Sequence, residues 1–261
     1  MCRILKSALG LAAAGVLVAT CAGAAVKTKT IEYKDGDTVL TGHLAWDDAA
    51  TGKRPGILVV HEWWGLNDYA KSRAEQLAKE GYVAFALDMY GGKKVTQHPK
   101  EAGEWMKEVT ANVEAWRKRA MAGIEVLKGQ SQVDGGKLAA IGYCFGGSTV
   151  MQLAYGGADL AAVVSFHGSL PPAPEGVASI KPRVLVAHGR DDKFIPAERI
   201  AAFQDGLDRA KATWEMSIYS GTRHGFTNPG ASAYGMENLA YNETADKHSW
   251  AAMLRLFGEV F

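Results

Sequence analysis

The most restrictive feature of this sequence is a cysteine with a glycine two residues before it and another two residues after it: Gly142, Cys144 and Gly146. The run 137–142 has the apolar pattern of a buried strand, and residues 146–155 have the pattern of a helix. A nucleophile elbow needs this arrangement, because the glycines let strand and helix approach closely around a strained turn. We therefore expect Cys144 at a sharp strand-to-helix turn.

A cysteine at such a turn is a candidate nucleophile. The backbone N–H of the next residue, Phe145, would point at the oxyanion that develops during attack on a carbonyl. The positive end of the helix dipole near the sulfur favours the thiolate. The alternative is a glycine-rich turn around a buried, inert thiol, and the flanking strand and helix favour the elbow.

Strand and helix patterns alternate along the rest of the chain. Two runs of alternating polarity around Lys34-Asp35-Gly36-Asp37 predict an opening antiparallel hairpin. Further strands are expected at 56–60, 82–87, 137–142, 161–166, 183–187 and 213–219. Helices are expected at 68–80, 99–128 (one helix or two), 146–155, 197–210 and 239–260. This order predicts an α/β fold with a mostly parallel central sheet and helices on both of its faces.

The composition is typical of one globular domain, which we place at residues 25–261. Apolar residues make up 48% and charged residues 22% of the chain, which excludes a disordered or fibrous protein. The proline cluster at 171–174 fits a loop within the pattern, not a domain boundary. The net charge is +1 and there is no basic stripe, so nucleic acid is not expected as a partner.

The first 24 residues have the pattern of a cleaved export signal. Arg3 and Lys6 precede an apolar run over residues 9–21, and Ala22-Gly23-Ala24 fits a cleavage site with small residues. The run is too short and too rich in alanine for a convincing membrane span. We expect a periplasmic or secreted protein that is not inserted in the membrane after cleavage. The alternatives are a buried N-terminal helix and a lipid anchor on Cys21.

Two later segments supply partners for the cysteine in the order that this fold uses, first an acid and then a histidine. Asp192 is expected to be the acid, because its spacing from the following Ile-Pro dipeptide sets it at the turn and leaves Asp191 more exposed. His224, in a loop after the last expected strand, would be the general base and acid, oriented by Asp192. Cys144 would then form a thioester that water hydrolyses. The alternatives are a solvated turn aspartate and a surface histidine.

A carboxylate follows the first core strand, in the loop that supplies the second oxyanion donor in α/β hydrolases. The N–H of Trp63 is the candidate donor. Glu62 could accept the thiol proton or hydrogen-bond with the thiol, which would tie activation of the nucleophile to the arrival of substrate. The alternative is a structural carboxylate held in an ion pair. The pair His61-Glu62 also suggests zinc, but Gly65 stands where the motif needs a second histidine, so no metal is expected.

With these residues the chain resembles the dienelactone hydrolase family, within the α/β-hydrolase fold. The resemblance covers nearly the whole chain after the signal and depends on His61-Glu62-Trp63-Trp64-Gly65, Leu87-Asp88-Met89-Tyr90-Gly91, Gly142-Tyr143-Cys144-Phe145-Gly146-Gly147, Asp192-Lys193-Phe194-Ile195-Pro196 and His224-Gly225-Phe226. It implies hydrolysis of a lactone or ester, of the carboxymethylenebutenolidase class, without a cofactor. It also implies a Cys-Asp-His triad with a glutamate that helps form the thiolate, here Cys144, Asp192, His224 and Glu62.

The sequence departs from the family where the substrate carboxylate is bound. Members that act on dienelactone hold its carboxylate with two arginines, and this chain has Gly92 and Asn228 at those positions. Lys93 and Arg223 are nearby cations but are out of register, and a displaced lysine does not reproduce a bidentate arginine clamp. Dienelactone is therefore not the expected natural substrate. For substrate contacts we expect Trp64, Tyr90, Arg223 and Phe226.

Two other functions remain open at this point. A non-catalytic member of the family would use the fold as a binding module and would turn over no ester. An acyltransferase would pass the acyl group to an acceptor other than water. The partner expected in the leading hypothesis is a small ester or lactone, and the protein is expected to be a monomer or a small homo-oligomer.

Overall fold

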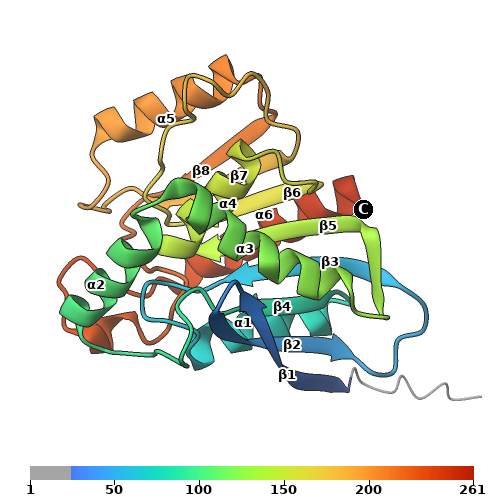
Figure 1. Cartoon of the computed structure of the whole chain (residues 1–261). Coiled ribbons are helices and arrows are strands. Elements are labelled where there is room, and N and C mark those ends of the chain that lie inside the picture. The colour runs from blue at the N-terminus through green and yellow to red at the C-terminus, as the bar shows by residue number, and fades with distance from the viewer. Residues whose placement is uncertain (1–24) are drawn as a thin grey trace, which may run out of the picture.

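One twisted sheet runs through the centre of the molecule (Figure 1). The computed structural model describes residues 25–261, and the export signal expected at residues 1–24 lies outside this range. Within the described range, strands pair in the order β1-β2-β4-β3-β5-β6-β7-β8. The strands are β1 (Val26–Asp35), β2 (Thr38–Asp47), β3 (Arg54–Val60), β4 (Val83–Leu87), β5 (Val133–Tyr143), β6 (Ala162–Phe166), β7 (Arg183–Gly189) and β8 (Trp214–Tyr219).

The sheet is antiparallel at its N-terminal edge and parallel elsewhere. Strands β1 and β2 form the expected hairpin, and β2 also pairs antiparallel with β4. From β4 to β8 all neighbouring strands are parallel. The carboxyl ends of the parallel strands therefore share one edge of the sheet, where proteins of this class form their binding sites.

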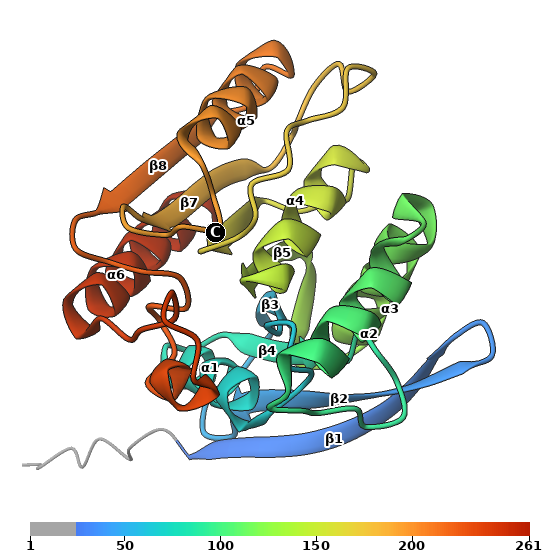
Figure 2. The ribbon, with the colours of Figure 1, turned by 90° about the vertical axis from the view of Figure 1, so that its left-hand side faces the viewer.

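Helices cover both faces of the sheet, as the alternating pattern predicts (Figure 2). Helices α1 and α6 pack on one face, and α3, α4 and α5 pack on the other, with α2 beside α3. The helices are α1 (Asp68–Lys79), α2 (Pro99–Thr110), α3 (Val113–Lys128), α4 (Phe145–Tyr155), α5 (Ala197–Arg209) and α6 (Glu243–Val260), with a 3₁₀ turn η1 (Ala231–Tyr234).

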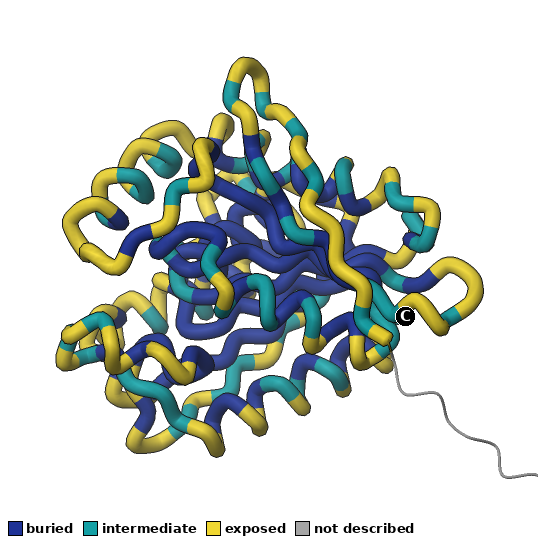
Figure 3. The backbone as a smooth tube through the Cα atoms, turned by 90° about the horizontal axis from the view of Figure 1, so that it is seen from below, coloured by how far each residue is buried: buried dark blue, intermediate teal, exposed yellow. Residues whose placement is uncertain are grey.

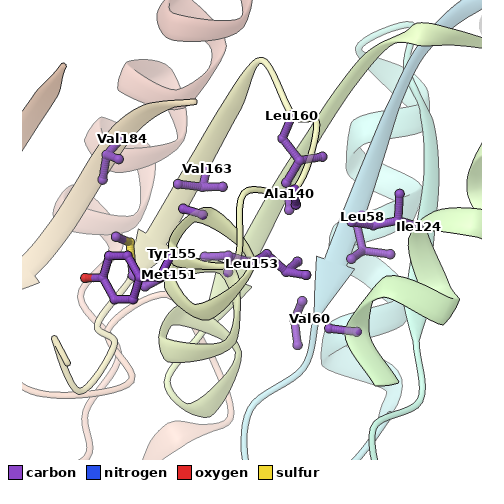
Figure 4. Packing of buried hydrophobic residues seen from close by; sticks show 14 of the residues in the cluster. Leu58, Val60, Ile124, Ala140, Met151, Leu153, Tyr155, Leu160, Val163 and Val184 are labelled. Atoms are coloured by element: carbon purple, nitrogen blue, oxygen red, sulfur yellow. The ribbon is translucent and has the colours of Figure 1, made fainter. Parts of the chain in front are cut away.

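Alternation along the strands separates two hydrophobic cores. Leu58 and Val60 of β3 belong to the core under α3, α4 and α5, whereas Ile57 and Val59 belong to the core under α1 and α6. All four side chains are fully buried, which is typical of a central parallel strand covered on both faces. Figure 4 shows the first core, in which side chains of α4 such as Met151 meet those of the strands. Figure 3 shows the buried strands at the centre and the exposed loops around them.

The structure decides one helix boundary that the sequence left open and corrects another. Residues 99–128 form two helices, because Asn112 adopts an extended backbone and caps α3 by accepting a hydrogen bond from the Ala115 N–H. The last helix begins at Glu243, later than expected, because Asn242 caps it in the same way. None of the helices in the described range is both long and apolar enough to cross a membrane.

Candidate active site

Cys144 lies at the turn between β5 and α4, at the carboxyl edge of the sheet. Its backbone has φ 54° and ψ −113°, a strained conformation for a residue with a side chain. Helix α4 begins at Phe145, so Cys144 occupies the N-cap position. The sulfur is therefore near the positive end of the helix dipole, which stabilises a thiolate.

The two glycines around Cys144 are required by close backbone contacts. A β-carbon at Gly142 would lie 2.0 Å from the carbonyl oxygen of Gly146, and a β-carbon at Gly146 would lie 2.2 Å from the carbonyl oxygen of Val60. Both separations are far shorter than van der Waals contact. The spacing of glycines around the cysteine is therefore a steric requirement of this turn.

His224 and Asp192 form a buried hydrogen-bonded pair. Nδ1 of His224 lies 2.7 Å from Oδ2 of Asp192, and the two side chains are 8% and 0% exposed. The other carboxylate oxygen of Asp192 accepts a hydrogen bond of 2.9 Å from the Phe194 N–H. Asp191 is exposed, as its spacing predicts. The carboxylate therefore holds the imidazole with Nδ1 toward it and leaves Nε2 available for the thiol.

The charges at this site favour an imidazolium at His224. Burial by itself lowers the pKa of His224, but the negative charge of a Cys144 thiolate and the hydrogen bond to Asp192 outweigh burial and raise this pKa to about 10. Burial raises the pKa of Asp192, but the hydrogen bond and charge of His224 outweigh burial and lower this pKa. The arrangement suits proton transfer from sulfur to imidazole.

Glu62 is a buried carboxyl group just after β3. Its Oε2 accepts a hydrogen bond of 2.7 Å from Nδ2 of Asn228. Oδ1 of the same amide accepts a hydrogen bond of 2.8 Å from the Gly230 N–H, so the NH₂ group must face Glu62. Burial raises the pKa of Glu62 to about 7, although Asn228 and the positive charges of His224 and Arg73 lower it. A carboxyl group that titrates near neutral pH in a buried site is suited to proton exchange.

Two backbone N–H groups are free to bind an oxyanion. The N–H of Phe145 belongs to the first turn of α4, where a helix offers no acceptor. The N–H of Trp63 lies in the loop after β3, and the carbonyl of Trp63 accepts a hydrogen bond of 3.0 Å from the Tyr90 hydroxyl. Neither N–H donates a hydrogen bond to another group of residues 25–261. Both therefore remain candidate oxyanion donors.

The histidine beside Glu62 is used in structural hydrogen bonds. Nε2 of His61 accepts a hydrogen bond of 3.2 Å from the Met89 N–H, so Nδ1 carries the proton and donates to the Glu62 carbonyl. The ring is fully buried, and both of its nitrogens have partners. In the part of the chain that the structure describes, no group of three or more His, Cys, Asp or Glu side chains is arranged to hold a metal ion.

A cavity of about 430 Å³ opens beside Cys144 and His224. This volume suits a ligand of moderate size. Its wall is mostly aromatic and aliphatic, with a few hydroxyl groups. The lining residues are Trp63, Met106, Thr110, Trp116, Cys144, Phe145, Ser148, Ser169, Pro171, Phe194, Ile195, His224 and Leu239.

None of the four residues expected to contact substrate lies in the wall of this cavity. Trp64 is buried and stacks on Tyr234 with ring centroids 3.9 Å apart. Tyr90 is buried with its hydroxyl on Trp63, and Phe226 is fully buried in the core under α1 and α6. The exposed Arg223 donates a hydrogen bond of 2.8 Å to the carbonyl of Glu237. The wall is instead formed by other residues, above all Trp63 of the expected motif.

The cation Lys93 also lies away from this cavity. It lines a different hollow of about 300 Å³ beside β2, together with His43 and Lys71. The structure therefore does not bring Lys93 or Arg223 to the cavity beside Cys144. Neither of them therefore occupies the place of the two arginines that the resemblance implies for members acting on dienelactone.

His167 and part of the cavity wall received no role in the sequence analysis. His167 follows strand β6 directly, and its Nδ1 accepts a hydrogen bond of 3.1 Å from the Cys144 N–H. A polar residue just after an apolar run is a usable signal, but its partner depends on the pairing of β5 with β6. Met106 and Thr110 come from α2, which has the pattern of an ordinary surface helix. Nothing in the local sequence of Thr110 indicates a place in the cavity.

The sheet order, the turn at Cys144 and the pair that follows it define an α/β hydrolase. Similar solved structures support this assignment. The dienelactone hydrolase-like promiscuous phosphotriesterase P91, from metagenomic libraries, is 41% identical, with a TM-score of 0.88 over 92% of this chain and 100% of that one. The structure named m3DLH is also 41% identical, with a TM-score of 0.87 over 90% of this chain and 99% of that one.

The sequence profile of the dienelactone hydrolase family matches residues 40–261, and the chain belongs to this family. Protein usf of Aquifex pyrophilus is 31% identical over 215 residues, which cover 76% of this chain and 86% of the relative. A Synechocystis protein provisionally named a carboxymethylenebutenolidase is 27% identical over 254 residues, covering 89% and 96%. The family and these relatives identify the protein as a hydrolase of lactones or esters.

Proposed function

We propose that this protein is an exported hydrolase of carboxylic esters or lactones in which Cys144 is the nucleophile, His224 the general base and acid, and Asp192 the residue that orients His224. The observation that carries the proposal is the cavity of about 430 Å³ whose wall includes both Cys144 and His224, with Asp192 hydrogen-bonded behind the imidazole. A binding module has no need of a strained cysteine beside a buried imidazole–carboxylate pair.

Acylation begins when Nε2 of His224 takes the thiol proton and Sγ of Cys144 bonds to the carbonyl carbon of the substrate. The carbonyl electron pair moves onto oxygen, where the N–H groups of Phe145 and Trp63 donate hydrogen bonds to it. The bond to the alcohol oxygen then breaks, and the departing alcohol takes the proton from His224. A thioester on Cys144 remains.

Deacylation repeats these steps with water. His224 removes a proton from water as the water oxygen bonds to the thioester carbon. The carbon–sulfur bond breaks, the carboxylic acid leaves, and sulfur recovers its proton from His224. Glu62 assists by hydrogen-bonding with the thiol when substrate arrives, which favours transfer of the thiol proton to His224; this role is supported by the burial of Glu62 and by its raised pKa of about 7.

The test is a comparison of the chain that starts at residue 25 with its Cys144→Ala variant on p-nitrophenyl butyrate and a small lactone. The variant should lose at least about 10³-fold in kcat with an unchanged melting temperature. Equal rates would refute the triad. Absence of turnover by the parent chain on a wide ester panel would favour the binding module. An ester formed with added alcohol would favour acyl transfer.

Hydrolysis of phosphotriesters is a second candidate activity. P91, which is 41% identical, is described as a promiscuous phosphotriesterase. A neutral phosphotriester needs no cation for binding, and the cavity beside Cys144 has no charged side chain of the described chain other than its candidate triad members. Release of p-nitrophenol from diethyl p-nitrophenyl phosphate, absent in Cys144→Ala, would support this activity.

Export to the periplasm or medium is proposed from the pattern of residues 1–24. Expression of the full chain in a bacterial host should yield a processed protein outside the cytoplasm, with a new N-terminus close to residue 25. Deletion of residues 2–24 should retain the protein in the cytoplasm. A Cys21→Ala variant that leaves the membrane fraction would indicate a lipid anchor instead.

A further inference from the structure

Apart from Cys144 and His224, the cavity beside Cys144 offers a substrate no charged side chain of the described chain. Its wall holds no lysine, arginine, aspartate or glutamate of the described chain. The hydroxyls of Ser148 and Ser169 lie 2.6 Å apart and bond to each other, and the hydroxyl of Thr110 donates a hydrogen bond of 2.9 Å to the Met106 carbonyl. The remaining wall, apart from Cys144 and His224, is aromatic or aliphatic, so apolar contact dominates binding.

The cations near this region are held elsewhere. Arg223 donates a hydrogen bond to the carbonyl of Glu237, and Nζ of Lys193 lies 3.2 Å from a carboxylate oxygen of the same residue. Both side chains are exposed. The positive charge of His224 is already balanced by Asp192 and the Cys144 thiolate. A substrate carboxylate that entered the cavity would therefore lose its water without gaining an ion pair to a lysine or arginine, and such desolvation is strongly unfavourable.

We propose that the site selects esters and lactones whose acyl part is uncharged and apolar, and discriminates against those that carry a carboxylate. This inference rests on the proposed function of Cys144. Aromatic side chains of Trp63, Trp116 and Phe194 provide the contact surface for the acyl part.

The kinetic test compares p-nitrophenyl hexanoate with the mono-p-nitrophenyl ester of adipic acid, in which a carboxylate replaces the terminal methyl group. The methyl ester of the second compound controls for size. We expect kcat/KM for both neutral compounds to exceed that of the anion by at least about 30-fold at pH 8. Equal values, or a preference for the anion, would overturn the inference while leaving the proposed hydrolase intact.

A substitution in the cavity wall tests the same inference by adding a positive charge. Thr110→Arg places a guanidinium at the C-terminal end of α2, where the helix dipole tolerates a cation, and Thr110→Gln is the neutral control of similar length. The arginine variant should raise kcat/KM for the anion by about 5-fold or more relative to the glutamine variant. Equal kcat/KM values of the two variants for the anion would contradict the inference that the lack of positive charge in the wall limits hydrolysis of the anion.

Binding to Cys144→Ala separates this inference from the proposed function. The variant cannot form a thioester, and Trp63 and Trp116 in the wall report occupancy through their fluorescence. The neutral ester should bind with a Kd at least about 10-fold below that of the anion. Selective binding without turnover by the parent chain would refute the hydrolase and uphold the selectivity, and equal binding would refute the selectivity.

His167 makes hydrogen bonds with both of its ring nitrogens. Its Nδ1 accepts a hydrogen bond of 3.1 Å from the Cys144 N–H, which is shared with the Phe166 carbonyl at 3.0 Å. Because Nδ1 accepts, the proton is on Nε2, which donates to Oγ1 of Thr227 at 2.7 Å. The Thr227 hydroxyl in turn lies 2.6 Å from the hydroxyl of Tyr69.

The imidazole of His167 is held neutral. It is fully buried, and burial, followed by the positive charges of His224 and Arg73, places its pKa well below the ordinary value. Its ring meets that of His224 edge to face with centroids 5.1 Å apart. A neutral neighbour is what an imidazolium at His224 requires, because a second cation there would oppose it.

We infer that His167 is a positioning residue, which fixes the strained backbone of Cys144 and so holds the thiol toward His224. Both His167 and Cys144 have positive φ, 41° and 54°. Neither conformation is favoured by a residue with a side chain, so the hydrogen bond between them helps to keep both in place. The chain through Thr227 sets the tautomer that makes Nδ1 an acceptor.

The matched variants are His167→Asn and His167→Leu. Asparagine adopts positive φ readily and presents an oxygen near the position of Nδ1, whereas leucine has no acceptor. Leucine should lower kcat by at least about 10-fold with KM within about twofold, and asparagine should lower it by about threefold or less. The pH midpoint of Cys144 alkylation by iodoacetamide should move to higher pH in the leucine variant only.

Two results would overturn the positioning role. The first is an unchanged kcat and alkylation profile in His167→Leu, and the second is an equal loss in the asparagine and leucine variants. If the leucine variant does not fold, Thr227→Val removes the partner of Nε2 while keeping the shape of the side chain. That variant should shift the alkylation midpoint in the same direction, and an unchanged midpoint there would contradict the inference.

Discussion

Asn228 donates a hydrogen bond of 2.7 Å from its amide to Oε2 of the buried Glu62. The family resemblance implies an arginine at the position of Asn228 in members that act on dienelactone. A neutral amide satisfies one carboxylate oxygen without supplying a positive charge, so burial dominates and the pKa of Glu62 is about 7. The protonation of Glu62 therefore changes within the physiological pH range.

Glu62→Gln should stabilise the protein at high pH. Because the pKa of Glu62 is raised from 4.5 to about 7 on folding, the native state keeps a proton that the unfolded chain releases, and the free energy of unfolding falls as pH rises through this window. Glutamine carries no charge and still accepts the Asn228 hydrogen bond. The variant should match the parent near pH 4 and exceed it by up to about 3 kcal/mol at pH 8.5.

Urea unfolding of both chains at the two pH values measures this difference. A stability gain that is the same at both pH values would show that Glu62 is not titrating between them. The same variant also bears on the proposed catalytic role, since an unchanged pH–rate profile would exclude Glu62 from a role in forming the thiolate.

Asn228→Ala should destabilise the protein, and the effect should depend on Glu62. Removal of the amide leaves a buried carboxylate oxygen without its donor, at an expected loss of about 1–3 kcal/mol in the free energy of unfolding at pH 8.5. In a Glu62→Ala background the acceptor is gone, and the loss should be smaller. A double-mutant cycle of the four chains measures the coupling, and a coupling near zero would mean that the hydrogen bond contributes nothing in solution.

Local features of the fold and the site could be predicted from the sequence. The order of strands and helices follows from apolar runs and periodic patterns, and the turn at Cys144 follows from the spacing of Gly142 and Gly146 on either side of it. The distinction between Asp191 and Asp192 also follows from a short motif. Each of these has a signal within a few positions of the sequence, although the close contact of Gly146 with Val60 also depends on the packing of α4 against β3.

The wall of the cavity could not be predicted, because it depends on contacts between distant elements. Trp63 and Trp64 are adjacent in the same motif, yet Trp63 lines the cavity and Trp64 stacks on Tyr234, far along the chain. Phe226 belongs to a family motif but is buried in the core under α1 and α6. The sequence indicates that such aromatic residues are near the site, but not which of them reach the open space.

Asp192→Asn should abolish most activity with little loss of fold. The Phe194 N–H donates to one side-chain oxygen of Asp192, and that contact would turn the amide NH₂ of the new asparagine toward Nδ1 of His224. Nδ1 would then have to accept a hydrogen bond, which puts the proton on Nε2 and stops it from receiving the thiol proton. We expect kcat to fall on the order of 10³- to 10⁴-fold.

Asp191→Asn is the matched control for this change. Its side chain is exposed and is the neighbour of Asp192 in sequence, so its kcat should stay within about twofold of the parent. Steady-state kinetics on p-nitrophenyl butyrate and a thermal melt of each variant provide the comparison. Equal effects of the two substitutions would contradict the assignment of Asp192 as the orienting acid.

Gly146→Ala should damage the turn that holds Cys144, whereas Gly176→Ala should not. A β-carbon at Gly146 would lie 2.2 Å from the Val60 carbonyl oxygen and 2.8 Å from that of His61, so helix α4 would have to move away from β3. A β-carbon at Gly176 meets nothing within 4 Å. We expect a loss of more than about 3 kcal/mol in the first variant and a change within about 0.5 kcal/mol in the second, measured by urea unfolding. Because the displaced backbone carries Cys144, any folded Gly146→Ala protein should also show slower alkylation of the thiol. A stable variant whose thiol is alkylated at the parental rate would mean that β3 and α4 are not in the close contact described.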